Sequence, residues 1–308
     1  MMLTPELKKL IDHKAKQECG YTNLLHSSVY IRQLNAHING ICKLASHEIE
    51  AKVDFLAGCL TITLDHPIQN LEFLRSRLCE GEKFSNIDDL SYIKRTSDNF
   101  PKAGRLNKIG QALFYAALAV KQDDTALRVV LSETGAKELD RFNVLRSHQV
   151  TESDLNLRMI GVWEQVRRDE KPYYLNKDTF DYYKMARERM VQKFEPELLL
   201  AYELTDRFFA DILSRKGNEA LYQVTSSLIS VFIESDTDGI LYSSVQAKGE
   251  PVVALTPQAV DDKLDHQFAC DVVIEKCFGY EFFQFKTLGK TSNIGRQSGK
   301  LGWSGVGV

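Results

Sequence analysis

Two charged residues of this chain, Arg105 and Glu133, are candidate site residues because of the sequence around them. Arg105 lies in the stretch AGRLN, and the planar fork of an arginine pairs with two oxygens of an anion at once. Glu133 ends the stretch TALRVVLSE, which as a helix places it on the same apolar side as Val129. A carboxylate on an apolar face favours a site role. The alternatives are a solvated surface arginine and a glutamate at a helix end in water.

A serine and a tyrosine share a third candidate position in the stretch DGILYSSV. The Asp-Gly pair predicts a turn that leads into a strand. Alternation along that strand places Tyr242 and Ser244 on one face and Leu241 on the other. Ser244 is therefore either a hydrogen-bonding site residue or an ordinary strand serine.

The elements that would position these residues follow from the apolar pattern. Ile68, Leu71, Leu74 and Leu78 have helical spacing, so residues 1–88 are expected to form a helical region. A domain of strands and short helices is expected over 89–288, and a flexible Gly- and Ser-rich tail over 289–308. Its expected strands are Leu113–Leu118, Phe142–Leu145, Ile240–Val245, Pro251–Leu255, Val272–Ile274 and Tyr280–Phe285, and its expected helices are Asp124–Glu133 and Leu221–Glu234.

Residues 170–216 are predicted to form a helical insert in this domain. The segment is rich in charge and aromatic residues, and Leu200, Leu204, Phe208 and Ile212 follow a helical period. Its aromatic stripe favours a packed helical face over a base-stacking platform, because acidic residues are interleaved with the rings.

The composition excludes several classes of function. The net charge of -3 offers no basic excess for nucleic acid, and no apolar stretch is long enough to span a membrane. The first residues contain no apolar signal segment, so we expect a cytoplasmic protein. Six cysteines without a CxxC pair indicate reduced thiols, and no metal is expected because the histidines and cysteines between His13 and His47 lack ligand spacing.

Two stretches of the chain resemble the RES domain, a family named for its Arg, Glu and Ser. The first is AGRLNKIGQALFYAAL, Ala103 to Leu118, and the second is VTSSLISVFIESDTDGILYSSVQAKGEPVVALTP, Val224 to Pro257. The resemblance covers roughly residues 90–258 and rests on these motifs. It implies an α+β fold with a mixed, split β core of the ADP-ribosyltransferase-like type, flanked by helices.

The activity that the resemblance implies is NAD breakdown, with NAD as substrate and phosphate or water as acceptor. The enzyme would be an NAD phosphorylase or glycohydrolase that cleaves the nicotinamide–ribose bond. Related proteins act as toxins of toxin–antitoxin systems, so a separate antitoxin protein is an expected partner. The sequence leaves the oligomeric state open, and an oligomer is possible. The competing hypotheses are a catalytically silent module that binds NAD or ADP-ribose, and a helical interaction protein.

The residue roles follow from matching the family motifs. Arg105 matches the motif arginine, and Arg95 stands near an earlier Tyr-Arg pair; both would hold the pyrophosphate. Tyr115 matches a tyrosine that would contact nicotinamide, and Ser244 matches the serine that would bind the ribose or carboxamide. Tyr242, on the same strand face as Ser244, is a further expected NAD-binding residue.

The catalytic glutamate departs from the pattern. The family reads Thr-Ala, two residues, then Glu, whereas Val129 stands there in this chain. Glu133 lies one helical turn further on and on the same side of the helix. We therefore expect Glu133 to replace it, and Arg105, Glu133 and Ser244 to form the catalytic set.

Overall fold

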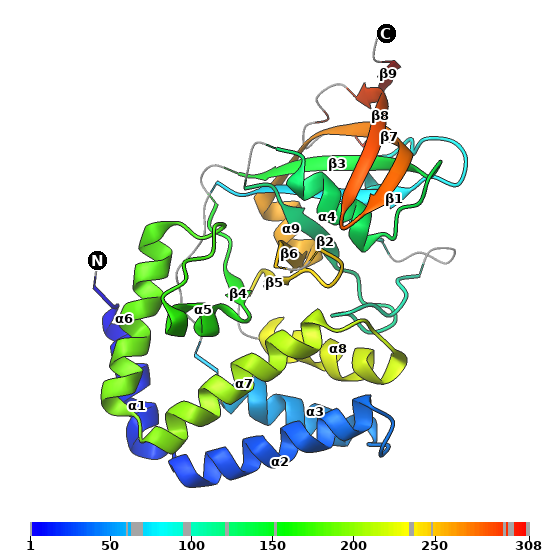
Figure 1. Ribbon diagram of the computed structural model, residues 1–308. Coiled ribbons are helices and arrows are strands. Elements are labelled where there is room, and N and C mark those ends of the chain that lie inside the picture. Colours follow the sequence, from blue (N-terminus) through cyan, green and yellow to red (C-terminus); the bar gives the residue numbers. More distant parts are fainter. Residues whose placement is uncertain are drawn as a thin grey trace. The chain divides into compact units, whose positions relative to one another are not determined.

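The computed structural model describes residues 2–59, 61–62, 70–94, 100–120, 123–150, 153–233, 237–247, 249–291, 294 and 299–305. Over these residues the fold is α+β with one nine-stranded sheet, as the sequence predicted at this coarse level (Figure 1). The chain divides into two compact units that are each built from separate segments. The helical unit comprises Met1–His66, Ala103–Lys108 and Arg158–Thr237, and the sheet unit comprises Pro67–Lys102, Ile109–Leu157 and Asp238–Val308.

The helical unit combines N-terminal helices with helices from the middle of the chain. Helix α2 packs along α7, and α3 packs against α8. Side-chain caps begin several of these helices: Thr4 accepts the Leu7 amide in α1, and Asn176 accepts the Thr179 amide in α6. The helices are α1 (Pro5–Gln17), α2 (Gly20–Ile38), α3 (Ser46–Asp54), the π-helical turn η1 (Phe55–Cys59), α5 (Val162–Arg168), α6 (Lys177–Lys193), α7 (Pro196–Ser214) and α8 (Glu219–Ile233).

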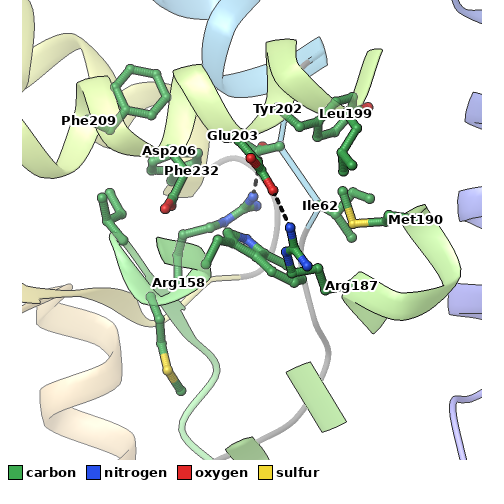
Figure 2. A pocket seen from close by; sticks show the side chains of 14 residues that line it. Ile62, Arg158, Arg187, Met190, Leu199, Tyr202, Glu203, Asp206, Phe209 and Phe232 are labelled. Carbon is green, nitrogen blue, oxygen red and sulfur yellow. Dashed lines mark hydrogen bonds and ion pairs between the residues drawn. The ribbon is translucent and has the colours of Figure 1, made fainter. Parts of the chain in front are cut away.

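The predicted helical insert forms α6 and α7, and its aromatic stripe is a packed face. Phe180, Tyr183 and Phe208 are each at most 5% exposed, so these rings are core residues of the unit. The buried side of α7 differs slightly from the predicted one, because Leu200 is 51% exposed whereas Tyr202 is buried. Residues of these two helices form part of the lining of a small cavity (Figure 2).

The sheet unit contains eight of the strands in the order β5-β6-β2-β1-β3-β7-β8-β9, and the seven pairings between them are antiparallel. The short strand β4 (Leu157–Met159) begins in this unit. The strands are β1 (Glu72–Leu78), β2 (Phe114–Leu118), β3 (Arg141–Gln149), β5 (Gly239–Ser243), β6 (Pro251–Leu255), β7 (Leu264–Gly279), β8 (Phe282–Thr291) and β9 (Trp303–Gly305), and the unit adds the 3-10 turn η2 (Ile87–Asp89), α4 (Thr125–Glu133) and α9 (Pro257–Lys263).

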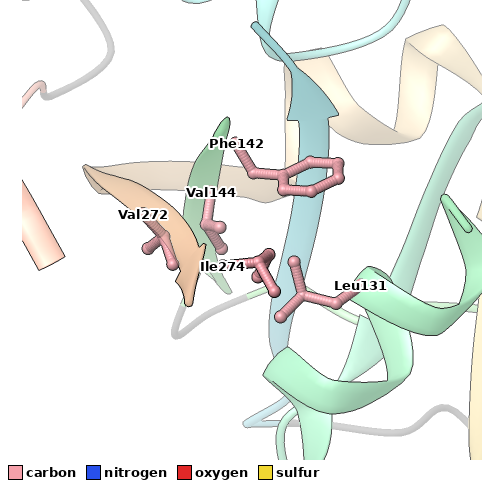
Figure 3. Close-up of a cluster of buried hydrophobic side chains, with 5 residues drawn as sticks. All are labelled: Leu131, Phe142, Val144, Val272 and Ile274. Carbon is pink, nitrogen blue, oxygen red and sulfur yellow. The ribbon is translucent and has the colours of Figure 1, made fainter. Parts of the chain in front are cut away.

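Helix α4 lies against β1 and β2 on one face of this sheet. Leu131 from α4 packs into a fully apolar cluster on that face (Figure 3). The cluster consists of Leu131, Phe142, Val144, Val272 and Ile274, each at most 5% exposed. The Ser76 hydroxyl of β1 donates to the Val130 carbonyl at 3.0 Å and ties the helix to the strand. These contacts fix where α4 ends.

Two regions differ from the sequence predictions. Residues Glu72–Leu78 form strand β1 in the middle of the sheet, where the leucine spacing predicted a helix. Pairing with β2 and β3 on both sides overrides that local spacing. In the tail that was expected to be flexible, Trp303–Gly305 form β9 and pair with β8. The strands predicted at 113–118, 142–145, 240–245 and 251–255 and the helix at 124–133 are confirmed within a few residues.

Candidate functional site

Glu133 and Ser244, which lie 111 residues apart in sequence, meet directly in the sheet unit. The Ser244 hydroxyl donates a hydrogen bond to Glu133 Oε1. The same carboxylate oxygen accepts the amides of Val245 at 3.0 Å and Gln246 at 3.3 Å. Ser244 Oγ in turn accepts the Ala247 amide at 2.8 Å. The end of α4 and the turn after β5 are therefore joined through one carboxylate oxygen.

The two oxygens of this carboxylate differ in their surroundings. Oε1 carries all the hydrogen bonds, whereas Oε2 accepts none from the part of the chain that the structure describes. Ser244 is only 2% exposed, but Glu133 belongs to the exposed residues. A carboxylate held this way presents one charged oxygen at the surface in a fixed position. Such a group suits a cationic ligand or a cationic transition state.

The position of Glu133 follows from how α4 begins and ends. Asp123 Oδ1 accepts the Thr125 amide at the first turn. After the helix, Gly135 adopts a φ of +67°, a left-handed conformation that favours glycine and ends helices. Helix α4 has nine residues, which places Glu133 in its last turn, as the pattern predicted.

Tyr115 and Tyr242 lie on the face of the sheet that α4 covers. Strand register pairs Tyr115 with Ala254 and Tyr242 with Val252, and Val252 pairs with Ala117. Residues opposite each other in antiparallel strands share a face, and alternation adds Ser244 to the same side. Tyr242 is 7% exposed, whereas Tyr115 is half-buried. Four predicted site residues thus share one side of the sheet unit.

Arg105 belongs to the helical unit and is held by backbone carbonyls there. Its Nη1 donates to the carbonyls of Leu213 at 3.0 Å and Arg215 at 2.9 Å, where α7 ends. The guanidinium also lies 5.9 Å from the ring of Tyr222. These contacts satisfy carbonyls that a helix end leaves unpaired. They give Arg105 a structural task, and its anion contact stays a prediction.

Other residues of the RES-like stretch Ala103 to Leu118 stabilise the loop in which they lie. Gly104 donates to the Asn107 carbonyl at 3.0 Å, and Asn107 is 4% exposed. Gly110 has a φ of +82°, and a Cβ there would lie 2.8 Å from the Phe100 ring. Only glycine fits that position. Arg95, the other predicted pyrophosphate ligand, lies outside the described residues.

The sequence analysis missed Arg75, which lies in β1. Its Nε donates to the Leu90 carbonyl at 3.0 Å, and its Nη1 donates to the Tyr115 carbonyl at 2.8 Å. Its guanidinium stacks on Phe114 at 5.4 Å, and burial lowers the pKa of Arg75 to about 10. Arg75 therefore positions the strand that carries Tyr115. The alternating arginines of EFLRSRL would have signalled it if that stretch had been interpreted as a strand.

Neither a metal site nor a membrane span is seen in the described parts of the chain. No group of three or more His, Cys, Asp or Glu side chains there is arranged to hold a metal ion. His37, from the N-terminal histidine group, instead accepts the Leu44 amide at 3.1 Å and bonds Gln223 at 3.2 Å. None of the helices in these parts combines the length and apolarity needed to cross a bilayer.

No family model, curated protein or solved structure matches this chain.

Proposed function

We propose that this protein binds NAD and cleaves its nicotinamide–ribose bond, by phosphorolysis or hydrolysis. The observation that carries the proposal is the anchored carboxylate of Glu133, which Ser244 and two backbone amides hold by one oxygen. The proposal extends to a split core of the ADP-ribosyltransferase-like type and to a cytoplasmic toxin that a partner antitoxin restrains.

The reaction needs a fixed negative charge near the sugar. When the bond between the nicotinamide nitrogen and the ribose carbon breaks, its electron pair leaves with nicotinamide and the ribose becomes cationic. Glu133 Oε2 would stabilise that charge, while Oε1 stays bound to the turn after β5. Phosphate or water then adds to the ribose carbon, and water gives up a proton. Tyr115 and Tyr242 offer rings and hydroxyls on the same side of the sheet for nicotinamide and ribose.

The pyrophosphate would be held by arginine, as the RES resemblance implies. Arg105 and Arg95 are the residues that match the family motifs. Because Arg105 Nη1 already binds two carbonyls, only the remaining donors of its guanidinium would serve an anion.

A second candidate is a module that binds NAD or ADP-ribose without cleaving it. Val129, 2% exposed in α4, occupies the position where the family has its glutamate. Glu133 Oε1 is also fully used in holding the turn after β5. Both observations favour a protein that binds NAD or ADP-ribose and does not cleave the nicotinamide–ribose bond.

Two measurements on the purified protein separate these candidates. Chromatography would follow nicotinamide release from NAD with and without phosphate, and calorimetry would titrate NAD and ADP-ribose. Release in either buffer supports the enzyme, and dependence on phosphate identifies the acceptor. Binding without release supports the silent module. The absence of both binding and release contradicts both candidates and favours a helical interaction protein.

A further inference from the structure

The sheet unit has one long strand edge without a pairing partner. Strand β8 pairs with β7 on one side, and on its other side β9 pairs only with residues 289–291 (Figure 1). No strand in the described ranges of the chain pairs with residues 282–288 on that side. A turn in which Gly279, Tyr280 and Glu281 have positive φ values bounds the edge at its other end. The backbone N–H and C=O groups of such an edge can pair with a further strand.

The side chains of this edge do little to block pairing. Residues 282–288 read FFQFKTL, a stretch of high β propensity that contains no proline and only one charge, on Lys286. The strand at the opposite end of the sheet, β4, has only three residues, and short edge strands are one way in which proteins avoid edge pairing. The edge of β8 is therefore the one that can accept a partner.

The two faces of β8 differ along this edge. Phe282, Gln284 and Lys286 are exposed on one face. Phe283 and Phe285 alternate with them on the other face, where they are half-buried and pack against the apolar cluster beneath α4. A strand placed beside β8 extends this apolar layer if it has large apolar side chains opposite Phe283 and Phe285. The β8 strand of a second copy of this chain meets that requirement.

Symmetry and charge together select one register for such a pair. Two identical edges related by a twofold axis run antiparallel, and opposite residues lie on the same face, so the axis passes through a single position of β8. An axis at Lys286 would place two lysines opposite each other. An axis at Phe285 would place residue 281 of one copy opposite residue 289 of the other, where β9 is already paired. An axis at Gln284 avoids both conflicts, and one nearer the turn would pair fewer residues.

We propose that two copies of this chain form a dimer in which their β8 strands pair antiparallel about Gln284. Residues 282–286 of each copy then pair with residues 286–282 of the other. Phe283 lies opposite Phe285 of the second copy, which gives two aromatic pairs, and Phe282 lies opposite Lys286 of the second copy. The backbone hydrogen bonding of the sheet continues across the axis. This dimer does not depend on NAD cleavage.

Sedimentation velocity on the full chain, from about 5 µM to about 1 mM, tests this dimer. We expect a reversible change from a monomer to a species of twice its mass, with a Kd of about 10 to 500 µM. Gln284→Lys and Gln284→Glu each place two like charges opposite each other at the axis, so each should dimerise at least about fivefold more weakly. An equimolar mixture of the two variants places lysine opposite glutamate and should dimerise about as tightly as the wild type.

Gln258 provides the matched control. It is exposed on α9 of the same unit and donates to Asp262, as Gln284 donates to Glu275. Gln258→Lys and Gln258→Glu therefore make the same charge changes away from β8 and should dimerise like the wild type. Weaker dimers of both Gln284 variants, with recovery in their mixture, support the β8 pairing. The proposal is overturned if the wild type stays monomeric up to about 1 mM, if either Gln284 variant dimerises as tightly as the wild type, or if their mixture dimerises no more tightly than the separate variants.

Discussion

At the residue scale, two carboxylates of this protein show how local contacts decide a side chain's role. Glu133 receives three hydrogen bonds on one oxygen and keeps the other at the surface. Asp206 receives one amide and buries its other oxygen without a partner in the described chain. The first arrangement fixes the position of a carboxylate at the surface, whereas burial in the second raises the pKa of Asp206 and favours its protonated form.

Asp206→Asn should change the pH dependence of stability. The folded pKa of Asp206, about 7, lies above its ordinary value of 3.8, so the fold binds this proton more tightly than the unfolded chain. Stability from this group is complete below pH 3.8 and is lost as the pH rises to about 7. The neutral asparagine avoids this loss, so the variant should be more stable above pH 7, by at most about 4 kcal/mol.

Urea denaturation between pH 5 and 8 measures this effect. Glu188→Gln changes an exposed residue of the neighbouring helix α6. The free energy of unfolding of this control should depend on pH as it does in the wild type. If the free energy of unfolding changes with pH by the same amount in Asp206→Asn and in the wild type, the pKa of Asp206 is not raised in the folded protein.

The sequence predicted some of these residues and missed others for physical reasons. Glu133 was found because a helical period places it beside Val129, and helical geometry is local. Ser244 was found because strand alternation is also local. The carbonyls that Arg105 binds lie more than a hundred residues away, and no local pattern contains them. Asp206 was missed for the same reason, because its burial depends on neighbours from other helices.

At the element scale, a buried ion network holds β3 to β7. The carboxylate of Asp271 is fully buried and accepts two hydrogen bonds from the Arg141 guanidinium, at 2.7 and 2.6 Å. It also accepts the side-chain amide of Asn143 at 3.1 Å and forms an ion pair with Lys83 at 3.3 Å. Burial alone would raise the pKa of Asp271, but the bonds from Arg141 and Lys83 outweigh it and lower the pKa. The two strands are therefore joined by charge as well as by backbone pairing.

Asp271→Asn should destabilise the sheet unit by about 2 to 4 kcal/mol at pH 7, because it leaves Arg141 and Lys83 without their anion. Since the folded pKa is lowered, this stability exists above the ordinary pKa of 3.8 and is lost in acid. Urea midpoints at pH 7 and pH 3 measure both effects, and the gap between variant and wild type should narrow at pH 3. Glu275→Gln, exposed on the same strand, should stay within about 0.5 kcal/mol of the wild type. An equally stable Asp271→Asn at pH 7 would refute the network's role.

Strand β1 shows the limit of local pattern at this scale. Leu71, Leu74 and Leu78 have the spacing of a helix, yet they belong to or border a central strand. The partners that decide the outcome are β2 and β3, which come some 40 and 70 residues later in the chain. The α+β class was predictable, because most strands have clear alternation or short apolar runs, but the order of the strands was not.

At the whole-molecule scale, each compact unit gathers segments that are distant in sequence. The segment Ala103–Lys108, part of the RES-like motif, belongs to the helical unit, while the rest of that motif belongs to the sheet unit. The predicted boundary at residue 88 divides the chain into consecutive parts, whereas each compact unit combines three segments that are not consecutive in sequence.

The cysteines provide a whole-molecule test of the thiol prediction. All six are free; Cys19, Cys42 and Cys59 are exposed, and Cys79 is buried. Reaction with Ellman's reagent should therefore label the three exposed thiols of the native protein first and the partly exposed Cys270 and Cys277 more slowly, and it should show six thiols after denaturation without reductant. Cys19 should react first, because a hydrogen bond from Thr22 lowers its pKa. Fewer than six thiols in denaturant would reveal a disulfide and refute this account.

The central claim is that the carboxylate of Glu133 stabilises the cationic ribose of NAD, and comparing two glutamine variants tests it most directly. Glu133→Gln keeps an oxygen for Ser244 and removes the charge, whereas Glu80→Gln removes an exposed charge elsewhere in the sheet unit. With nicotinamide release as the readout and equal thermal stability as the check on folding, we predict a loss of about 10²- to 10³-fold for Glu133→Gln. Glu80→Gln should stay within about twofold of the wild type. A folded Glu133→Gln that releases nicotinamide at the wild-type rate would contradict the claim.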